Sequence, residues 1–392
     1  MSIWLEKYLI IRIKLNLIII YFDILIIMSD ENDVSYSGII NRGSTCYINS
    51  VLQCLRFTPS ILDKMFDSKE HKLDIKYLEL INACSDDDIQ TNEEFKKYNI
   101  DVKRIKNLNV YFHYKQFLIE LIKSSDAIDA ISLIQSCKNH IIQMDINLGD
   151  DIFMGQNDAQ EFLVYLLDTI HESKGLPKKL PLKYPSLEAC GNSIEKKIIF
   201  QAQKDMITHY SKSYSWIINS FYYQKMAIIK CNKCSYFSTK IDNENHIIIN
   251  IPQNVSNYTI YDCLDNYFGK ETFDENNYWK CEKCKNERGN YKQYRMMDCP
   301  DTLIIYFNRF ERIGYTNSFK KITSLIDFPL TLNMKKYKLI DREKNSMYQL
   351  YGVVNQIGSR DSGHYYSFCK NIKSQTDSNW YVFNDERVTK IN

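Results

Sequence analysis

Residues 36–55 read Tyr36-Ser-Gly-Ile-Ile-Asn-Arg-Gly-Ser-Thr-Cys46-Tyr-Ile-Asn-Ser-Val-Leu-Gln-Cys-Leu55. The second half of this stretch has apolar residues at helical spacing, which predicts a helix with one buried face: Ile48, Val51, Leu52 and Leu55. Ser44 and Thr45 come just before that face, and we expect their hydroxyls to cap the helix. Cys46 is therefore expected at a helix N-terminus, where unpaired N–H groups and the helix dipole favour a thiolate.

The residues before Cys46 fit the presentation of a nucleophile. Gly43 allows a sharp backbone turn immediately upstream. Asn41 is five residues before the cysteine, close enough to direct a side-chain N–H at a developing oxyanion. A lone cysteine at a helix start is more often a small buried residue. The catalytic interpretation therefore depends on finding partners for Cys46.

A cysteine nucleophile needs a base, and the base needs a group that orients it. The chain has only seven histidines, and His364 stands in the segment Gly363-His364-Tyr-Tyr-Ser. Further along comes Trp380-Tyr-Val-Phe-Asn384-Asp385. Cysteine, histidine and asparagine or aspartate thus follow one another in the chain order that papain-like thiol proteases use.

Three segments together resemble a known family. The segment around Cys46 resembles the Cys box of the ubiquitin-specific proteases, and the segments of His364 and Asn384 resemble their His box. Residues 155–163, Gly-Gln-Asn-Asp-Ala-Gln-Glu-Phe-Leu, resemble the family's Gln-Asp-Ala-x-Glu-Phe-Leu segment. The resemblance spans about residues 36–388. It implies an α+β fold, the papain-like right hand of thumb, palm and fingers, with a zinc ribbon in the fingers.

The resemblance also implies a reaction and the residues that perform it. It implies a thiol-dependent deubiquitinase that hydrolyses isopeptide bonds after the C-terminal glycine of ubiquitin on conjugated proteins. Cys46 would attack the carbonyl, and His364 would take the thiol proton and later protonate the leaving amine. Asn384 would orient the imidazole, with Asp385 as a helper or substitute. Asn41 and the backbone N–H of Cys46 would stabilise the oxyanion.

A second predicted helix follows at about residues 156–172. Asp158 and Glu161 have capping-box spacing, so the spacing alone favours Asp158 as an N-cap. The resemblance implies in addition that Asp158 faces the substrate tail, where it can pair with an arginine of ubiquitin. Asn157 departs from the family's usual glutamine. The full set of substrate-binding residues that the resemblance implies is Gln156, Asp158, Gly358, Gly363 and Tyr365, with the two glycines flanking the channel for the tail.

Four cysteines occur in two knuckles, Cys231-Asn-Lys-Cys234 and Cys281-Glu-Lys-Cys284. Each knuckle can place two thiolates on one side of a tetrahedral zinc, so the pair predicts one structural zinc per chain. The separation of the knuckles matches a ribbon at the tip of an inserted β-hairpin. Four thiolates leave no open position for a catalytic water. We expect no catalytic cofactor, and no basic recognition helix follows that would suggest a DNA-binding finger.

Composition narrows the class of protein. The 392 residues are 44% apolar and 25% charged, with a net charge of +2, which is typical of a globular protein and not of a nucleic-acid binder. The family resemblance implies ubiquitin and ubiquitinated proteins as the partners. A nucleophilic cysteine and zinc thiolates both need reduced thiols, so the twelve cysteines favour an intracellular protein, in the cytoplasm or nucleus.

Residues 1–28 are apolar and isoleucine-rich, but Arg12, Lys14 and Asp23 interrupt them. Three interpretations remain open: translation from Met28, an additional packed or interfacial helix, and a membrane anchor. No small-residue cleavage site follows, which argues against a signal peptide. We expect no membrane association unless this stretch is an anchor.

The pattern changes from helices to strands after a break at residues 175–185. Strand-like runs include residues 247–251, 302–307 and 348–354. We therefore expect an N-terminal extension over 1–35 and a catalytic domain over 36–392. Within it, the thumb would span about 36–185 and the palm 186–392, with the fingers at about 215–300.

Two other functions share these features. A catalytically inactive ubiquitin-binding scaffold would keep the binding surfaces, although the intact cysteine, histidine and asparagine argue against it. A protease for another ubiquitin-like modifier would use the same catalytic residues. The motifs do not separate this last function from a deubiquitinase.

Overall fold

The computed structural model describes most of the chain between Tyr36 and Ile391. The described residues are 36–83, 93–98, 100–146, 155, 157–182, 186–191, 193–234, 236–251, 257–274, 278–314, 318–339, 346–360, 362–374 and 377–391. The apolar stretch 1–28 and Gln156 lie outside them. The chain divides into two compact units: unit 1 is Met1–Leu176 with Tyr351–Asn392, and unit 2 is Pro177–Leu350.

Unit 1 combines helices with one small sheet. Its described helices are α2 (Cys46–Arg56), α3 (Pro59–Met65), α4 (Ser68–Ala83), α6 (Glu93–Lys97), α7 (Val102–Lys123), α8 (Ile131–Met144) and α9 (Ala159–Lys174). The predicted helix after Thr45 is confirmed as α2, which begins at Cys46. Its apolar face is buried as expected, and so is most of the rest of the helix. A helix buried on nearly all sides lies at the centre of its unit.

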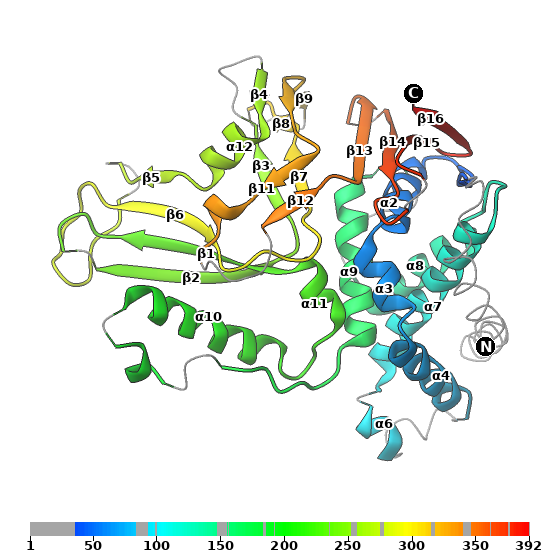
Figure 1. Ribbon diagram of the computed structural model, residues 1–392, viewed down its shortest axis with the longest axis horizontal. Coiled ribbons are helices and arrows are strands. Elements are labelled where there is room, and N and C mark those ends of the chain that lie inside the picture. The colour runs from blue at the N-terminus through cyan, green and yellow to red at the C-terminus, as the bar shows by residue number, and fades with distance from the viewer. Residues whose placement is uncertain are drawn as a thin grey trace. The chain divides into compact units, whose positions relative to one another are not determined.

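The sheet of unit 1 is an antiparallel meander of strands β13 (Gly352–Gly358), β14 (Gly363–Lys370), β15 (Trp380–Asn384) and β16 (Arg387–Ile391). Helix α2 packs against β13, β14 and β15 on one side and against α7 and α9 on the other (Figure 1). The predicted strand over 348–354 is divided in the structure, since β12 (Met347–Gln349) belongs to unit 2.

A buried ion cluster joins three helices of unit 1. The Asp74 carboxylate of α4 accepts hydrogen bonds from Lys115 Nζ of α7 and Lys174 Nζ of α9, each at 2.6 Å. All three side chains are about 1% exposed. Removing one partner of such a group leaves a buried charge uncompensated, which typically costs about 3–5 kcal/mol. The cluster therefore fixes how α4, α7 and α9 meet.

The segment before α2 lies between two distant parts of unit 1. Ile39 forms a parallel bridge with Ile128, and its N–H donates to the carbonyl of Asp385 at 2.9 Å. Gly38 makes this approach feasible: a Cβ built on it would lie 2.3 Å from the carbonyl oxygen of Glu386. Any larger residue at position 38 would push the β15–β16 turn away from α2.

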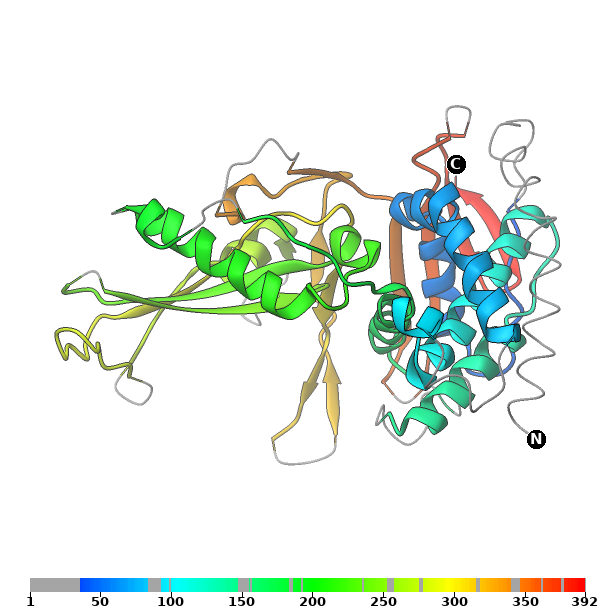
Figure 2. The ribbon, with the colours of Figure 1, turned by 90° about the horizontal axis from the view of Figure 1, so that it is seen from below.

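Unit 2 is mostly strands. Its main sheet has the order β2-β1-β6-β5 and is antiparallel, and four further strand pairs accompany it. The strands are β1 (Tyr223–Lys230), β2 (Phe237–Glu244), β3 (Ile247–Asn250), β4 (Asn257–Thr259), β5 (Lys270–Thr272), β6 (Tyr291–Met296), β7 (Ile305–Asn308), β8 (Phe310–Arg312), β9 (Phe319–Lys321), β10 (Leu325–Asp327), β11 (Thr331–Asn333) and β12. Figure 2 shows the β8–β9 hairpin projecting from the rest of this unit.

The described α-helices of unit 2 are α10 (Ile194–Tyr210), α11 (Trp216–Phe221) and α12 (Ile260–Tyr267). The core of the unit lies between α12 and the strands, and includes Ile247, Ile249, Leu264, Phe268 and Met296. The predicted strand over 247–251 is confirmed as β3, which pairs in parallel with β7. The strand predicted over 302–307 begins three residues later than expected, at Ile305.

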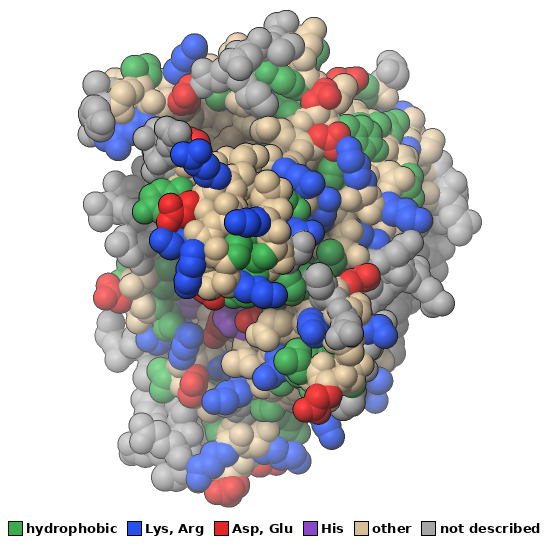
Figure 3. Space-filling model, turned by 90° about the vertical axis from the view of Figure 1, so that its left-hand side faces the viewer, with side chains coloured by type: hydrophobic (Ala, Val, Ile, Leu, Met, Phe, Trp, Pro, Cys, Tyr) green, Lys and Arg blue, Asp and Glu red, His purple; other side chains and the backbone are tan. Residues whose placement is uncertain are grey.

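The surface of unit 2 carries mixed charge. On the face shown in Figure 3, Lys and Arg side chains are spread among Asp and Glu side chains. Across the described part of the chain, no helix combines the length and apolarity that crossing a bilayer requires.

Candidate functional site

Cys46 lies directly after a tight turn. Gly43 and Ser44 both have left-handed backbones, with φ of 79° and 52°, which confirms the predicted turn. The expected hydroxyl cap is wrong: Thr45 occupies the N-cap position but makes no side-chain cap hydrogen bond. Its hydroxyl instead accepts from the Arg42 N–H at 3.1 Å and donates to Asn41 Oδ1 at 3.2 Å. The hydroxyl therefore organises the turn and leaves the first helical N–H groups uncapped.

The surroundings of Cys46 change the expectation for its acidity. Its side chain is only 2% exposed, and burial raises the pKa of the thiol. A hydrogen bond from the backbone N–H of Tyr365 lowers the pKa of the thiol, and the charge of Asp385 raises it further. The thiolate expected from the helix N-terminus is thus not favoured by the site alone, because desolvation outweighs the N–H groups. A base is needed to remove the proton.

His364 has its partner within hydrogen-bond reach. It stands at the start of β14, opposite Ile357 of β13. Its Nε2 lies 2.6 Å from Asn384 Oδ1 at the end of β15. Asp385 Oδ2 lies at 3.9 Å from the same nitrogen, beyond a hydrogen bond. The structure therefore places Asn384 within hydrogen-bond distance of His364 and Asp385 just beyond that distance.

Asp385 is held by two asparagines. Its Oδ2 accepts from Asn41 Nδ2 and its Oδ1 accepts from Asn49 Nδ2, both at 2.8 Å. Its backbone is left-handed, with φ of 50°. Asn49 is 2% exposed and also donates to the carbonyl of Ile39. No motif in the sequence marks Asn49, whose one signal is an amide side chain about one helical turn after Cys46.

Asn41 is fixed at both ends of its amide. Its Oδ1 accepts from the N–H and the hydroxyl of Thr45, at 3.3 and 3.2 Å. Its Nδ2 donates one hydrogen to Asp385. An amide nitrogen carries two hydrogens, so the second N–H is set in a fixed direction by the other three contacts.

The start of α9 contacts the strand of His364. Asp158 caps α9 by accepting from the Gln160 N–H at 2.8 Å, as predicted. Burial raises the pKa of Tyr365, and a hydrogen bond from the backbone N–H of Ala159 to its hydroxyl opposes that rise. Burial and the charge of Asp158 raise the pKa of Glu161, which Arg360 opposes. Acidic groups therefore gather where α9, Tyr365 and the β13–β14 turn meet.

The two predicted channel glycines belong to that turn. Gly358 has φ of 88°, and a Cβ there would lie 2.6 Å from the carbonyl oxygen of Ser362. A Cβ on Gly363 would lie 2.7 Å from the carbonyl oxygen of Ile357 and 2.8 Å from that of Ser359. Gln356 donates to the carbonyl of Ser359 at 2.6 Å. The tight turn before His364 alone thus explains why both positions are glycine.

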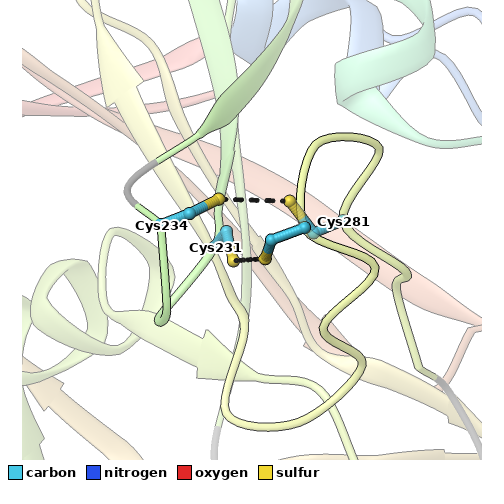
Figure 4. Close-up of side chains that lie close together, drawn as sticks. Cys231, Cys234 and Cys281 are labelled. Atoms are coloured by element: carbon cyan, nitrogen blue, oxygen red, sulfur yellow. Dashed lines mark hydrogen bonds between the residues drawn. The ribbon is translucent and has the colours of Figure 1, made fainter.

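The four knuckle cysteines converge in unit 2. The first knuckle follows β1 and the second precedes β6, and these two strands are paired. Their thiols point toward one another from two loops (Figure 4). Cys231 and Cys284 sulfurs are 3.6 Å apart, and those of Cys234 and Cys281 are 3.5 Å apart. All four sulfurs lie within 4.8 Å of one another, so they could hold a metal ion.

The donor set fits zinc in both chemistry and size. Four sulfurs around a tetrahedral zinc at 2.3 Å would be separated by about 3.8 Å, close to the distances found here. A buried asparagine connects the two knuckles: Asn290 Oδ1 accepts from the Asn232 N–H, and its Nδ2 donates to the carbonyls of Trp279 and Asn286. Asn290 is 0% exposed. An isolated asparagine carries no motif, so the sequence alone does not predict this role.

Known proteins resemble the chain over nearly its whole length. The family model described as ubiquitin carboxyl-terminal hydrolase matches residues 37–392. A probable ubiquitin carboxyl-terminal hydrolase of Acanthamoeba polyphaga mimivirus is 24% identical, over 92% of this chain and 87% of the relative. Ubiquitin carboxyl-terminal hydrolase 2 of Rattus norvegicus is 25% identical over 93% of this chain. The chain spans about half of that rat protein, 52% of its length.

A solved structure agrees in fold. The SAGA Ubp8/Sgf11/Sus1/Sgf73 DUB module bound to ubiquitin aldehyde contains a chain with a TM-score of 0.59 and 23% identity, over 92% of this chain and 67% of that one. The predicted α+β right-hand fold is thereby confirmed. The chain belongs to the ubiquitin carboxyl-terminal hydrolase family, as a cysteine-type deubiquitinase domain of the ubiquitin-specific protease kind.

Proposed function

We propose that this chain hydrolyses the isopeptide bond between the C-terminal glycine of ubiquitin and a lysine of a conjugated protein, with Cys46 as the nucleophile. The observation that carries the proposal is the 2.6 Å contact between His364 Nε2 and Asn384 Oδ1. The residue after this histidine directs its backbone N–H toward Cys46. Nucleophile, base and orienting group are therefore supplied by α2, β14 and β15.

His364 is the base in this proposal. If Nε2 donates to Asn384 Oδ1, the other nitrogen, Nδ1, carries a lone pair that can accept the thiol proton. Because burial raises the pKa of Cys46, deprotonation depends on that transfer. The resulting imidazolium later donates its proton to the leaving lysine amine. Water then hydrolyses the thioester with His364 again acting as the base.

Asn41 and the Cys46 backbone N–H are the proposed oxyanion donors. Cys46 is the first residue of α2, so its N–H belongs to the group that has no partner within the helix. The second N–H of Asn41 is held in place by Thr45 and Asp385. Donors fixed before the reaction stabilise developing charge without reorganising, which is how an oxyanion hole lowers a barrier. Asp385 acts through Asn41 and supports Asn384.

The tail of ubiquitin would run past the acidic groups at the start of α9. Asp158 and Glu161 supply negative charge there, and Tyr365 lines the same place. A basic side chain of the substrate can pair with this charge. Gly358 and Gly363 keep the neighbouring turn narrow. Gln156 is proposed as a further contact from the same segment.

We further propose that the four knuckle cysteines bind one structural zinc. Four thiolates complete a tetrahedral site, and structural zinc binding is coupled to folding. Zinc would hold the tips of β1 and β6 together in the fingers, over about residues 215–300. The catalytic domain would begin near Tyr36. Thiolate chemistry at both sites supports an intracellular location.

Reaction with ubiquitin that carries a C-terminal electrophile tests the proposal. Wild-type chain is expected to form one covalent adduct at Cys46 and to cleave a ubiquitin–lysine isopeptide substrate. Cys46→Ala should lose both activities and still bind ubiquitin. Binding without labelling of the wild type would indicate an inactive scaffold, and labelling only by another modifier's electrophile would indicate a protease for that modifier. Persistent labelling of Cys46→Ala would refute the assignment of the nucleophile.

A further inference from the structure

Two more thiols meet inside unit 1, apart from Cys46 and from the zinc-site cysteines. Cys54 lies in α2 and Cys369 lies in β14. Their Sγ atoms are 3.7 Å apart, although the residues are 315 positions apart in the chain. They share an apolar cluster that includes Tyr36, Phe57 and Phe383. The two elements that carry the nucleophile and the base therefore also carry this thiol pair.

The backbone beside the pair allows a close approach. Gly352 of β13 is the register partner of Cys369. A Cβ built on Gly352 would lie 3.1 Å from Cys54 Sγ and 3.9 Å from Cys54 Cα. A side chain at position 352 would thus compete with the sulfur of Cys54. Its absence lets the helix bring this sulfur to the strand that carries Cys369.

The pair does not resemble a metal site. Two thiols fall short of the four ligands that a structural zinc takes. Within the described ranges, the only group of three or more possible metal ligands is the one formed by the knuckle cysteines. Nor does the proposed reaction use either thiol. We propose that Cys54 and Cys369 are an oxidation site, and that a peroxide converts them to a reversible disulfide joining α2 to β14.

The two thiols differ in access, which sets the order of the steps. Cys54 is partly exposed, whereas Cys369 is 0% exposed. Burial raises the pKa of Cys369, and the guanidinium of Arg56 opposes that effect. Cys54 is therefore the thiol that meets the oxidant first.

The chemistry balances with a peroxide as the oxidant. The Cys54 thiolate attacks one peroxide oxygen, the O–O bond breaks, and a sulfenic acid and hydroxide form. The Cys369 sulfur then attacks the Cys54 sulfur, so the S–S bond forms and the S–O bond breaks. The departing hydroxide takes up the Cys369 proton and leaves as water. Both thiols are oxidised and one peroxide is reduced to two waters.

The cross-link would leave the reacting groups free. Cys54 is eight residues after Cys46, and Cys369 is five residues after His364. Neither catalytic side chain is consumed when the disulfide forms. A disulfide that closes a long loop restricts the unfolded chain. The oxidised protein is expected to unfold at a higher temperature than the reduced one.

The experiment uses the full chain carrying Cys46→Ala, so that the nucleophile does not consume oxidant. Hydrogen peroxide is added, free thiols are blocked with iodoacetamide, and an unreduced digest is analysed by mass spectrometry. We expect one linked peptide that joins Cys54 to Cys369, and a rise of several degrees in Tm that dithiothreitol reverses. Recovery of both residues as alkylated thiols after peroxide would overturn the proposal.

Two further variants, made in the same background, separate a disulfide from mere packing. With Cys369→Ser, Cys54 should stop at the sulfenic acid, which dimedone traps, and the rise in Tm should disappear. The matched control is Cys190→Ser, whose sulfur donates to the carbonyls of Ser186 and Lys196, contacts that a hydroxyl can replace. It should behave as its parent. If Cys369→Ser does not fold, the linked peptide in the parent decides; equal dimedone trapping with and without Cys369 would refute the disulfide.

Discussion

The two cysteine sites of this protein are built in opposite ways. Cys46 lies in the interior of unit 1, and its neighbours are fixed by a central helix, a sheet and direct hydrogen bonds among Asn41, Asn49 and Asp385. The knuckle cysteines lie on loops at the ends of β1 and β6, which are joined by the buried Asn290 and by a hydrogen bond from the Tyr236 hydroxyl to Glu282. The first site is preorganised by packing, whereas the four thiols of the second could be completed by a metal ion. Changes near Cys46 should therefore affect rate, and changes at the knuckles should affect stability.

His364→Ala gives the largest expected effect. Turnover should fall to background, because the buried Cys46 thiol has a raised pKa and loses its proton acceptor. The reaction of Cys46 with iodoacetamide, followed from pH 6 to 11, tests the cause. In the variant, the raised pKa keeps the thiol neutral until the pH passes above its ordinary value of 9.0. In the wild type, the imidazolium should move the profile to lower pH; superimposable profiles would contradict the role of His364.

Asn41→Ala comes next. The oxyanion exists only after attack, so kcat should fall by about 100- to 1,000-fold while KM changes little. Steady-state kinetics on an isopeptide substrate measure both constants. Zinc content should be unchanged, because Asn41 lies in unit 1. A loss well below that range would mean that the Cys46 backbone N–H suffices.

Asn384→Ala and Asp385→Ala sharpen the comparison within the proposed catalytic site. Asn384 contacts His364 directly, whereas Asp385 is 3.9 Å from the same nitrogen and is held by two asparagines. Asn384→Ala should therefore lower kcat more. Asp385→Ala should lower kcat and also Tm, because Asn41 and Asn49 lose their acceptor. A larger kcat loss in Asp385→Ala would exchange the roles of the two residues.

Cys281→Ser tests the other site. It should lower zinc content and Tm and weaken ubiquitin binding, since three thiolates hold zinc less well than four. Small thiol reagents should still modify Cys46 at the wild-type rate. Cys190→Ser is the matched control in the same unit and should retain zinc. Full activity and stability of chelated, zinc-free protein would show that the knuckles do not depend on a metal.

A chain that starts at Met28 should give the smallest effect. Every motif that supports the two cysteine sites lies downstream of it. We expect the same kcat, Tm and zinc content as for the full chain. Loss of solubility on truncation would indicate that residues 1–27 pack on the domain. Sedimentation of the full chain alone with lipid vesicles would indicate a membrane anchor.

Local patterns carried most of what the sequence predicted. Helical spacing located α2, and the short spacing within each knuckle identified the thiols that converge. These features depend on neighbours a few residues away. The cap at Thr45 was predicted wrongly, because the Thr45 hydroxyl oxygen accepts from the Arg42 N–H of the preceding turn and not from a helix N–H.

Properties that depend on distant partners could not be predicted. The raised pKa of Cys46 follows from burial, which only the packed unit determines. Asn49 has a role because its side chain donates to Asp385, a residue 336 positions later in the chain. Gly38 is required by the carbonyl of Glu386, and no local turn signals that need. A single sequence contains these residues but not the contacts that give them their roles.

The hydrogen bonds from Asn41 and Asn49 to Asp385 have a consequence during synthesis of the polypeptide on the ribosome. Asp385 is 344 positions after Asn41 and 336 positions after Asn49, so the ribosome adds both asparagines long before it adds Asp385. A nascent chain that displays Cys46 still lacks β14 and β15, and with them His364 and Asn384. Contacts of such high sequence separation form late in folding. The proposed proton acceptor, His364, is thus added 318 positions after Cys46, so we expect a nascent chain that ends before it to show no protease activity.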